Sequence, residues 1–127
     1  MYLHPTGVES SSLSLARGGP AATGTSNYGW FGGGFNASIR ATVDRIDFSN
    51  DSSTASPRGP LSSARRSLAA TGNSNYGWFG GGLSPGPTTV ATVDRINFSN
   101  DSVTATPRGP LSAARGYLAA TSNTHIG

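Results

Sequence analysis

Short runs of alternating side chains, each bounded by glycine, proline, serine or asparagine, recur along the chain. In one such run, Tyr76 and Trp78 fall on one face of an extended strand and Phe79 falls on the other. In a later run, Val93 lies opposite Ile96 in the same way. Both faces of these strands carry bulky side chains, which is typical of a sheet packed between two similar sheets.

Turn-forming residues divide the sequence from 61 to 110 into four strand-sized segments. The predicted strands cover residues 66–71, 75–80, 92–98 and 103–106. Gly72 and Asn73, between the first two strands, predict a tight hairpin that needs positive φ. Residues 99–102, between the last two, predict an Asx-type turn. Four antiparallel strands joined by short hairpins make a meander sheet, which is the architecture of one β-propeller blade.

Almost all of this pattern occurs more than once. Three stretches recur nearly unchanged: 27–34 as 75–82, 41–51 as 91–101, and 57–62 as 107–112. The offset is 48 residues at Tyr28 and 50 residues at Asp44. The difference falls between residues 35–40 of one copy and 83–90 of the other. A length change confined to one place marks a surface loop.

The repeats organise the whole chain. We expect an N-terminal arm over residues 1–12, a first blade over 13–60, a second blade over 61–110 and a partial third blade over 111–127. Propellers close with about four to eight blades, so fewer than three blades leave two apolar faces and an unpaired strand edge in water. We therefore expect a homo-oligomer that completes a propeller ring, or docking on a larger assembly.

The bulky side chains of the two copies form the predicted structural core. They come from the second and third strands of each repeat, where the alternation is clearest. They are Tyr28, Trp30, Phe31, Val43, Ile46, Phe48, Tyr76, Trp78, Phe79, Val93, Ile96 and Phe98.

Composition agrees with an all-β protein. Hydrophobic residues make up 35% of the chain, and 18 glycines and 8 prolines are spread through it instead of being gathered in one linker. The absence of cysteine excludes disulfides, thiolate metal sites and a thiol nucleophile. No run approaches the roughly 18 apolar residues that span a bilayer, and no signal is visible, so we expect a soluble chain without a membrane partner.

The formal charge of +3 is carried by arginine alone, because the chain has no lysine. The arginines recur at fixed repeat positions, which favours planar contacts to carboxylates and carbonyls within the scaffold over a basic surface for nucleic acid. Asp44 and Asp94 are the expected carboxylates. The predicted structural ion pairs draw on Asp44, Arg45, Arg65, Asp94, Arg95 and Arg115.

Few residues offer catalytic chemistry. His4 and His125 lie outside the repeats, where a single histidine is more often a solvated group than a catalyst. The glycine runs 32–34 and 80–82 lack the lysine and the helix of a phosphate loop. The oxygen-rich stretch 47–51 could hold calcium, but without a bending glycine or a bidentate glutamate it favours an Asx turn. We expect no enzyme activity, no cofactor and no metal.

The two loops of unequal length are candidate ligand loops. Their polar residues, which we single out as possible ligand contacts, are Asn36, Ser38, Arg40, Ser84, Thr88 and Thr89. Neutral drift in an unconstrained loop explains the length difference equally well.

The order of motifs resembles a kelch repeat. An arginine precedes the first strand, an aromatic strand ends in a double glycine, and a Val-Asp-Arg-Ile third strand precedes a polar turn. The resemblance covers residues from about 13 to 127. It implies that Arg65 and Arg115 occupy the kelch arginine position, Gly80 and Gly81 the double glycine, and residues 93–97 the third strand.

One departure from the kelch pattern lies in the fourth strand. Kelch blades usually carry a tryptophan there, and residues 103–106 contain none. Trp30 and Trp78 of the second strands could supply the missing bulk instead.

The amino-acid sequence of the repeats is also similar to that of tandem repeats in virion and tail-fibre-like proteins of marine and cyanobacterial phages. That similarity implies a structural or interaction module of a virion or phage tail, which binds itself or other virion proteins and mediates assembly or surface attachment. The alternative is a carbohydrate-binding, lectin-like propeller that takes a cell-surface glycan. The positions of Trp30 and Trp78 distinguish the two, because a ring buried between blades cannot stack on a sugar.

Overall fold

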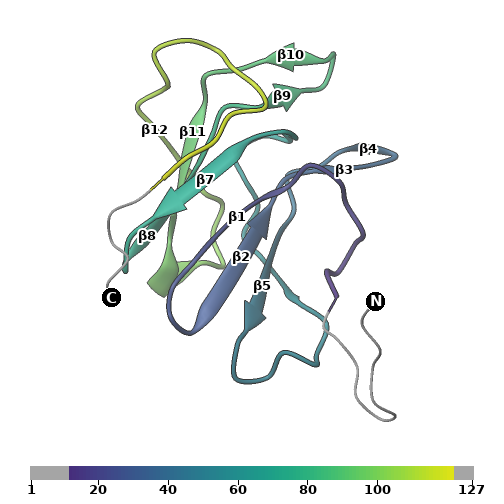
Figure 1. The fold of residues 1–127 in the computed structure, drawn as a ribbon, viewed down its shortest axis with the longest axis vertical. Helices are drawn as coiled ribbons and strands as arrows, with labels where there is room; N and C mark the ends of the chain where they lie inside the picture. The colour runs from purple at the N-terminus through teal and green to yellow at the C-terminus, as the bar shows by residue number, and fades with distance from the viewer. Residues whose placement is uncertain (1–11, 122–127) are drawn as a thin grey trace.

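Two antiparallel four-stranded sheets make up most of residues 12–121, the part of the chain that the computed structural model describes (Figure 1). The first contains, in spatial order, β1 (Ala21–Gly24), β2 (Tyr28–Gly32), β5 (Val43–Asp47) and β6 (Ser56–Arg58). The second contains β7 (Ala69–Gly72), β8 (Tyr76–Gly80), β11 (Val93–Asn97) and β12 (Thr106–Arg108). The predicted all-β class with four-stranded antiparallel sheets is confirmed.

Each repeat builds one sheet, and the registers of the two sheets match. Trp30 of β2 lies opposite Arg45 of β5, and Trp78 of β8 lies opposite Arg95 of β11. In each sheet the first three strands follow chain order, with the fourth on the outer side of the third. Near-identical sequences therefore give near-identical meanders.

The length-variable loops form two small hairpins. They are β3 (Phe35–Asn36) with β4 (Ser38–Ile39), and β9 (Leu83–Ser84) with β10 (Thr88–Thr89). Both extend to the upper right in Figure 1, away from the main sheets. The extra residues of the second copy lengthen its turn, where Gly86 takes a φ of 124°.

The predicted strand boundaries of the second copy need two corrections. The fourth strand runs from Thr106 to Arg108, not over residues 103–106. It includes Pro107, which an edge strand tolerates because its missing N–H can face solvent. The first strand begins at Ala69 instead of residue 66, and Arg66 makes only an isolated bridge, to Leu83.

The hairpin between β7 and β8 is not the predicted tight turn. Neither Gly72 nor Asn73 has positive φ. The Asn73 side-chain oxygen instead accepts hydrogen bonds from the N–H groups of Asn75 and Tyr76, at 2.8 and 2.9 Å. An Asx-type bond therefore closes a longer loop, and asparagine acts through its side chain rather than through a left-handed backbone.

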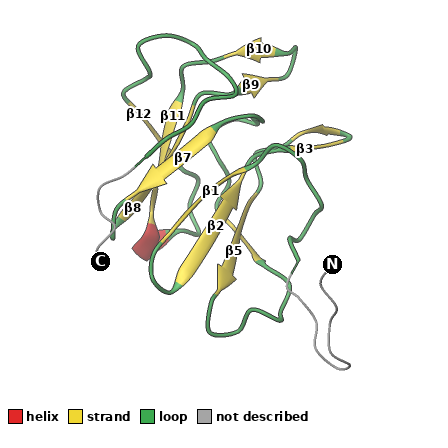
Figure 2. Ribbon diagram, viewed as in Figure 1, coloured by secondary structure: helices red, strands yellow, loops and turns green. Residues whose placement is uncertain are grey.

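The turn after the third strand has the predicted Asx geometry in both copies. Asn97 Oδ1 accepts from the backbone N–H of Ser99 at 3.0 Å, and Asp47 Oδ1 accepts from that of Ser49 at 2.9 Å. In the second copy this bond caps the 3-10 helix η1 (Phe98–Asn100), the red segment of Figure 2. The Ser49 hydroxyl and N–H lower the pKa of the Asp47 carboxyl, so this oxygen already has its partners.

The core lies between the two sheets. Phe79 of the second sheet is fully buried and packs on Gly32 of the first, where an added Cβ would lie 2.8 Å from the Phe79 ring. From the opposite side, Trp30 packs toward the second sheet and is 1% exposed. The other core members are Ala21, Val43, Leu61, Leu68, Ile96 and Ala105. Glycine beside the aromatic residue lets the two sheets approach closely.

The glycine triplets end the second strands with a backbone that other residues rarely adopt. Gly33 and Gly81 have φ of 75° and 69°. A side chain on Gly33 would also place Cβ 2.5 Å from the carbonyl oxygen of Arg65. These glycines are structural, and the segment that begins each following repeat lies directly against them.

Within residues 12–121 there is no helix of the length and apolar character needed to cross a bilayer.

Candidate functional site

The carboxylate of Asp101 joins the two repeats. Asp101 follows η1 in the second repeat, yet its side chain contacts three residues of the first. It accepts from Trp30 Nε1 at 2.8 Å, from Arg45 Nη1 at 3.2 Å, and from Arg58 Nε and Nη2 at 3.0 and 2.7 Å. Both Arg58 nitrogens donate to the same oxygen, Oδ1, and such charge-assisted bonds are among the stronger ones in proteins.

Asp101 is a buried anion, since only 5% of its surface is exposed. Burial alone would raise the pKa of its carboxyl. Hydrogen bonds from Arg58 and Trp30 and the charges of Arg58 and Arg45 outweigh that cost, so the pKa lies below its ordinary value. The group is held ionised at neutral pH and acts as an electrostatic link, not as a proton donor.

Aromatic rings enclose this link. Phe98 of the second repeat stacks on Trp30 of the first, with ring centroids 4.2 Å apart and planes 16° from parallel. Arg45 lies over the ring of Tyr28 at 4.4 Å from its centroid, which leaves one side of its guanidinium to face Asp101. The boundary thus combines an ion cluster with an apolar stack.

A second kind of ion pair lies inside each repeat. Arg65 Nη2 is 2.7 Å from Asp94 Oδ2, and Arg17 Nη1 is 3.5 Å from Asp44 Oδ2; all four side chains are fully buried. Ser62 and Ser14 donate to the same two carboxylates. Burial lowers the pKa of both arginines, and the facing aspartates partly restore it. These pairs fix the entry segment of a repeat onto its own third strand.

The remaining predicted ion-pair residues take different positions. Arg95 lies over the Tyr76 ring at 4.2 Å from its centroid, and Arg45 pairs with Asp101 instead of a residue in its own repeat. Arg115 is exposed, and within residues 12–121 its guanidinium has no ion pair, although its carbonyl accepts from Gly82.

Side chains that point toward the following repeat are buried in the first copy and more open in the second. Trp30 is 1% exposed and Val43 is 0% exposed, whereas their equivalents Trp78 and Val93 are only half-buried.

Side chains that point toward the preceding repeat show the reverse. Phe79 and Ile96 are 0% and 3% exposed, while Phe31 and Ile46 are half-buried. Phe48 is 53% exposed, and its equivalent Phe98 is covered by Trp30. Together these pairs show that each outer face of residues 12–121 presents the side chains that are buried at the internal boundary.

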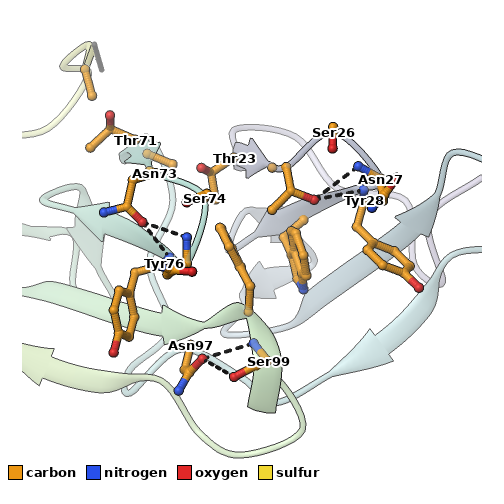
Figure 3. Close-up of a pocket in the computed structure, with 18 of the residues that line it drawn as sticks. Thr23, Ser26, Asn27, Tyr28, Thr71, Asn73, Ser74, Tyr76, Asn97 and Ser99 are labelled. Atoms are coloured by element: carbon orange, nitrogen blue, oxygen red, sulfur yellow. Dashed lines mark hydrogen bonds between the residues drawn. The ribbon is translucent and has the colours of Figure 1, made fainter. Parts of the chain in front are cut away.

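A groove runs between the hairpin ends of the two sheets (Figure 3). Hydroxyl and amide side chains line it together with aromatic rings, and the Tyr28 and Tyr76 rings lie at its two sides. Several of these polar groups already hold the backbone: Thr25 Oγ1 accepts from the N–H of Tyr28, and Asn73 Oδ1 from that of Tyr76. Trp30 also lines the groove, but its indole N–H donates to the Asp101 carboxylate.

The predicted ligand loops lie apart from this groove. Asn36 uses its amide to bond the carbonyl of Ala16, and Arg40 donates to the carbonyl of Asn36. In the other hairpin, Ser84 donates to the Thr88 carbonyl at 3.3 Å. Ser38, Thr88 and Thr89 are exposed. Arg40 and Ser84 thus stabilise their own hairpins, and Asn36 ties its hairpin to the entry segment.

Sequence reasoning did not assign Asp101 and Arg58 to a site. The signal was present, because a tryptophan, two arginines and an aspartate each recur at a fixed repeat position. The partners are 71 and 43 residues apart in the chain, however, and only the packing of one sheet on the next brings them together. Among the described residues, no three His, Cys, Asp or Glu side chains gather as a metal site would require. His4 and His125 lie outside those residues.

Comparison of the chain with models of known protein families and with curated protein sequences finds no match.

Proposed function

We propose that this chain is a non-enzymatic structural and interaction module built from kelch-like propeller blades. Each four-stranded meander acts as one blade, and the Asp101 cluster is the contact between consecutive blades. The meander order, the apolar faces on both sides of each sheet and the glycine-lined approach of Phe79 support this assignment.

The observation that carries the proposal is the exposure of matched residues at the two outer faces. Phe48 is 53% exposed where Phe98 is stacked on an indole, and Trp78 is more open than Trp30. Apolar and charged groups in this arrangement favour burial against another blade. The module therefore associates, with further copies of itself that complete a ring or with other proteins of a larger assembly.

The similarity of the repeats to those of marine and cyanobacterial phages supports a place for this module on a virion or tail. There it would mediate assembly or attachment to a cell surface. The chain offers repeated surfaces for that role, and its function depends on contacts rather than on a reacting group.

Sedimentation velocity of the purified full-length chain across the micromolar range tests the proposal. We expect species larger than a monomer, with a fraction that rises with concentration. High salt should weaken the association, since charge pairs contribute to it. A single folded monomer at every concentration and salt condition would contradict self-association, and failure to bind any virion protein would then remove the interaction role.

A second candidate function, carbohydrate binding, is favoured by the groove of Figure 3. Its hydroxyl and amide groups suit sugar hydroxyls, and Tyr76 offers a ring for stacking. Trp30 is unavailable for this role, because it is buried between the sheets. A glycan array with wild type, Tyr76→Ala and Tyr117→Ala tests it. Tyr117 is 74% exposed and lies outside the groove, so it is the control. Binding that only Tyr76→Ala abolishes supports a lectin.

A further inference from the structure

The open face of the second sheet repeats the binding site that Asp101 fills in the first. Trp78, Arg95 and Arg108 occupy the repeat positions of Trp30, Arg45 and Arg58, which together hold the Asp101 carboxylate. The second site therefore has the same indole N–H and two guanidinium donors.

This second site is already arranged for a carboxylate. Tyr76 and Trp78 have ring centroids 5.9 Å apart and planes at 49°, against 5.8 Å and 52° for Tyr28 and Trp30. Arg95 lies over Tyr76 at 4.2 Å, as Arg45 lies over Tyr28 at 4.4 Å. These side chains would need little rearrangement to bind a carboxylate, which favours affinity.

Within residues 12–121 this site has no acidic partner. Every ion pair to an Asp in that range involves Arg17, Arg45, Arg58 or Arg65, and no hydrogen bond engages the Trp78 indole or the Arg108 guanidinium. Arg108 is exposed, and Trp78 is half-buried. Two positive charges and an indole donor thus face outward together.

The matching acid lies on the opposite outer face of the same chain. Asp51 is the repeat equivalent of Asp101; it is exposed, and no described residue forms an ion pair with it. Phe48 precedes it as Phe98 precedes Asp101, and Phe48 is 53% exposed. The first repeat therefore presents the aromatic ring and the carboxylate that the second repeat uses at the internal boundary.

We propose that a second copy of this chain docks head to tail on the open face of the second sheet, with its Asp51 bound by Trp78, Arg95 and Arg108 and its Phe48 stacked on Trp78. This inference rests on the proposed function and specifies the residues of its self-contact. The contact is heterologous, so repeated use closes a ring or extends a filament.

The backbone around this face agrees with such docking. At the internal boundary, Gly59 N–H donates to the Asp101 carbonyl at 2.8 Å, and a Cβ on Gly59 would lie 1.9 Å from the Val103 carbonyl oxygen. Around its equivalent, Gly109, no atom lies within 4 Å of an added Cβ. The space that the loop 101–103 fills on the first sheet is open on the second.

One segment must move for a second copy to dock. Residues 111–121 of the receiving copy are equivalent to residues 13–23 of the incoming one. Both segments would occupy the same position beside Gly82, so they cannot bind there together. The receiving segment is mostly exposed and forms no strand, whereas the incoming one leads into β1, which pairs with β2 through four residues. Residues 111–121 therefore hold this position only until the second copy displaces them.

Two matched substitutions in the full-length chain test the inference. Asp51→Asn should raise the dissociation constant for self-association, measured by sedimentation equilibrium, by about 30-fold or more, because it removes one partner of a charge cluster that docking buries. In dilute protein, where the chain is monomeric, its thermal unfolding should match that of the wild type. Asp101→Asn, at the same repeat position, should lower the unfolding temperature, which makes it the internal control.

A charge exchange tests the pairing itself. Asp51→Arg and Arg108→Asp should each abolish association alone, and an equimolar mixture of the two should restore it. If Asp51→Asn associates like the wild type, or the mixture stays monomeric, the assigned contact is wrong while the interaction module stands. If the wild type itself never associates, the self-contact and the self-assembly part of the proposed function fall together.

Discussion

The Arg65 guanidinium lies 2.7 Å from the Asp94 carboxylate, and neither side chain has any surface exposed to solvent. Arg65 also donates to the carbonyl oxygens of Gly81 and Thr92, at 2.8 and 3.1 Å. These bonds hold the start of the second repeat against its second and third strands. A buried pair is costly to break because the remaining charge stays in a medium of low dielectric constant.

Replacing Arg65 with methionine should therefore destabilise the fold strongly. Asp94 would retain only the Ser62 donors, and loss of one partner of a buried pair typically costs about 3–5 kcal/mol. The neighbouring substitution Arg66→Met is the control, since among the described residues the Arg66 side chain makes only a distant ring contact, 5.9 Å from the Phe35 centroid. Urea unfolding measures both. Equal losses for the two variants would show that the buried pair is not a main source of stability.

The equivalent change in the first repeat, Arg17→Met, should cost less. Arg17 Nη1 is 3.5 Å from Asp44, and its Nε and Nη1 atoms are buried without a hydrogen-bond partner. Because part of its desolvation is uncompensated, we expect a loss of about 1–2 kcal/mol. The same urea titration gives the comparison. A larger loss for Arg17→Met than for Arg65→Met is the outcome that contradicts this ranking.

The two glycines that follow the fourth strands should respond differently to alanine. Gly59→Ala places a methyl group against the Val103 carbonyl and should lower stability by about 1–3 kcal/mol. Gly109→Ala meets no atom within 4 Å; it should leave the unfolding temperature of the dilute monomer unchanged and weaken self-association. Differential scanning calorimetry and sedimentation measure the two effects. An unaffected Gly59→Ala would mean that the loop after η1 does not pack on the first sheet.

Much of the fold could be predicted from the amino-acid sequence. The alternation around Tyr76, Trp78 and Phe79 predicted a sheet with two apolar faces, and the observed core has Trp30 and Phe79 packed from opposite sides of the boundary. The turn residues predicted most strand ends to within a few residues of the observed ends. At the glycine triplets, Gly81 and Gly82 have positive φ, a backbone conformation that glycine adopts readily.

The contacts across the boundary could not be predicted in this way. Asp101 meets Trp30 across 71 residues of chain, and no local pattern distinguishes it from Asp51, which has the same neighbours in sequence but is exposed. The tight turn at Gly72 failed for a local reason: the Asn73 side chain satisfies the loop N–H groups, so positive φ is not needed. Side-chain capping determines the turn between β7 and β8, and packing between repeats determines the contacts of Asp101. The hydrophobic pattern specifies neither.

Acid should weaken the boundary through Asp101. Burial raises the pKa of this carboxyl, but Arg58, Trp30 and Arg45 together lower it by more than burial raises it. Its folded pKa therefore lies below the ordinary value. The carboxylate therefore contributes its full stabilisation above the unfolded pKa of about 3.9 and loses it as the pH falls through the folded pKa.

The measurement is the difference in unfolding free energy between wild type and Asp101→Asn as a function of pH. We expect a constant difference of about 1–3 kcal/mol near neutrality, which then shrinks below about pH 4. Asp51→Asn is the control, because Asp51 is exposed. A difference that stays constant down to the lowest pH at which the fold survives would show that ionised Asp101 does not stabilise the boundary.

Hydrogen exchange should report the displacement of the C-terminal segment. The N–H of Tyr117 donates to the Ser67 carbonyl at 2.8 Å, and that of Leu111 to the Ala91 carbonyl at 2.8 Å. Dilute protein should protect both amides moderately. At concentrations where the chain associates, Tyr117 should lose protection, whereas Ile96 in the core should not. Increased protection of Tyr117 on association would mean that residues 111–121 stay in place.

We infer that the two outer faces are the halves of one interface, which the internal boundary already shows in its closed form. Electron microscopy of the associated full-length chain tests this most directly, through the rotational symmetry of the particle. We expect a ring of four-stranded sheets in which every boundary repeats the contact between Asp101 and Trp30, including the boundaries between copies. Particles that contain one chain only, or copies joined through the β3–β4 and β9–β10 hairpins, would contradict it.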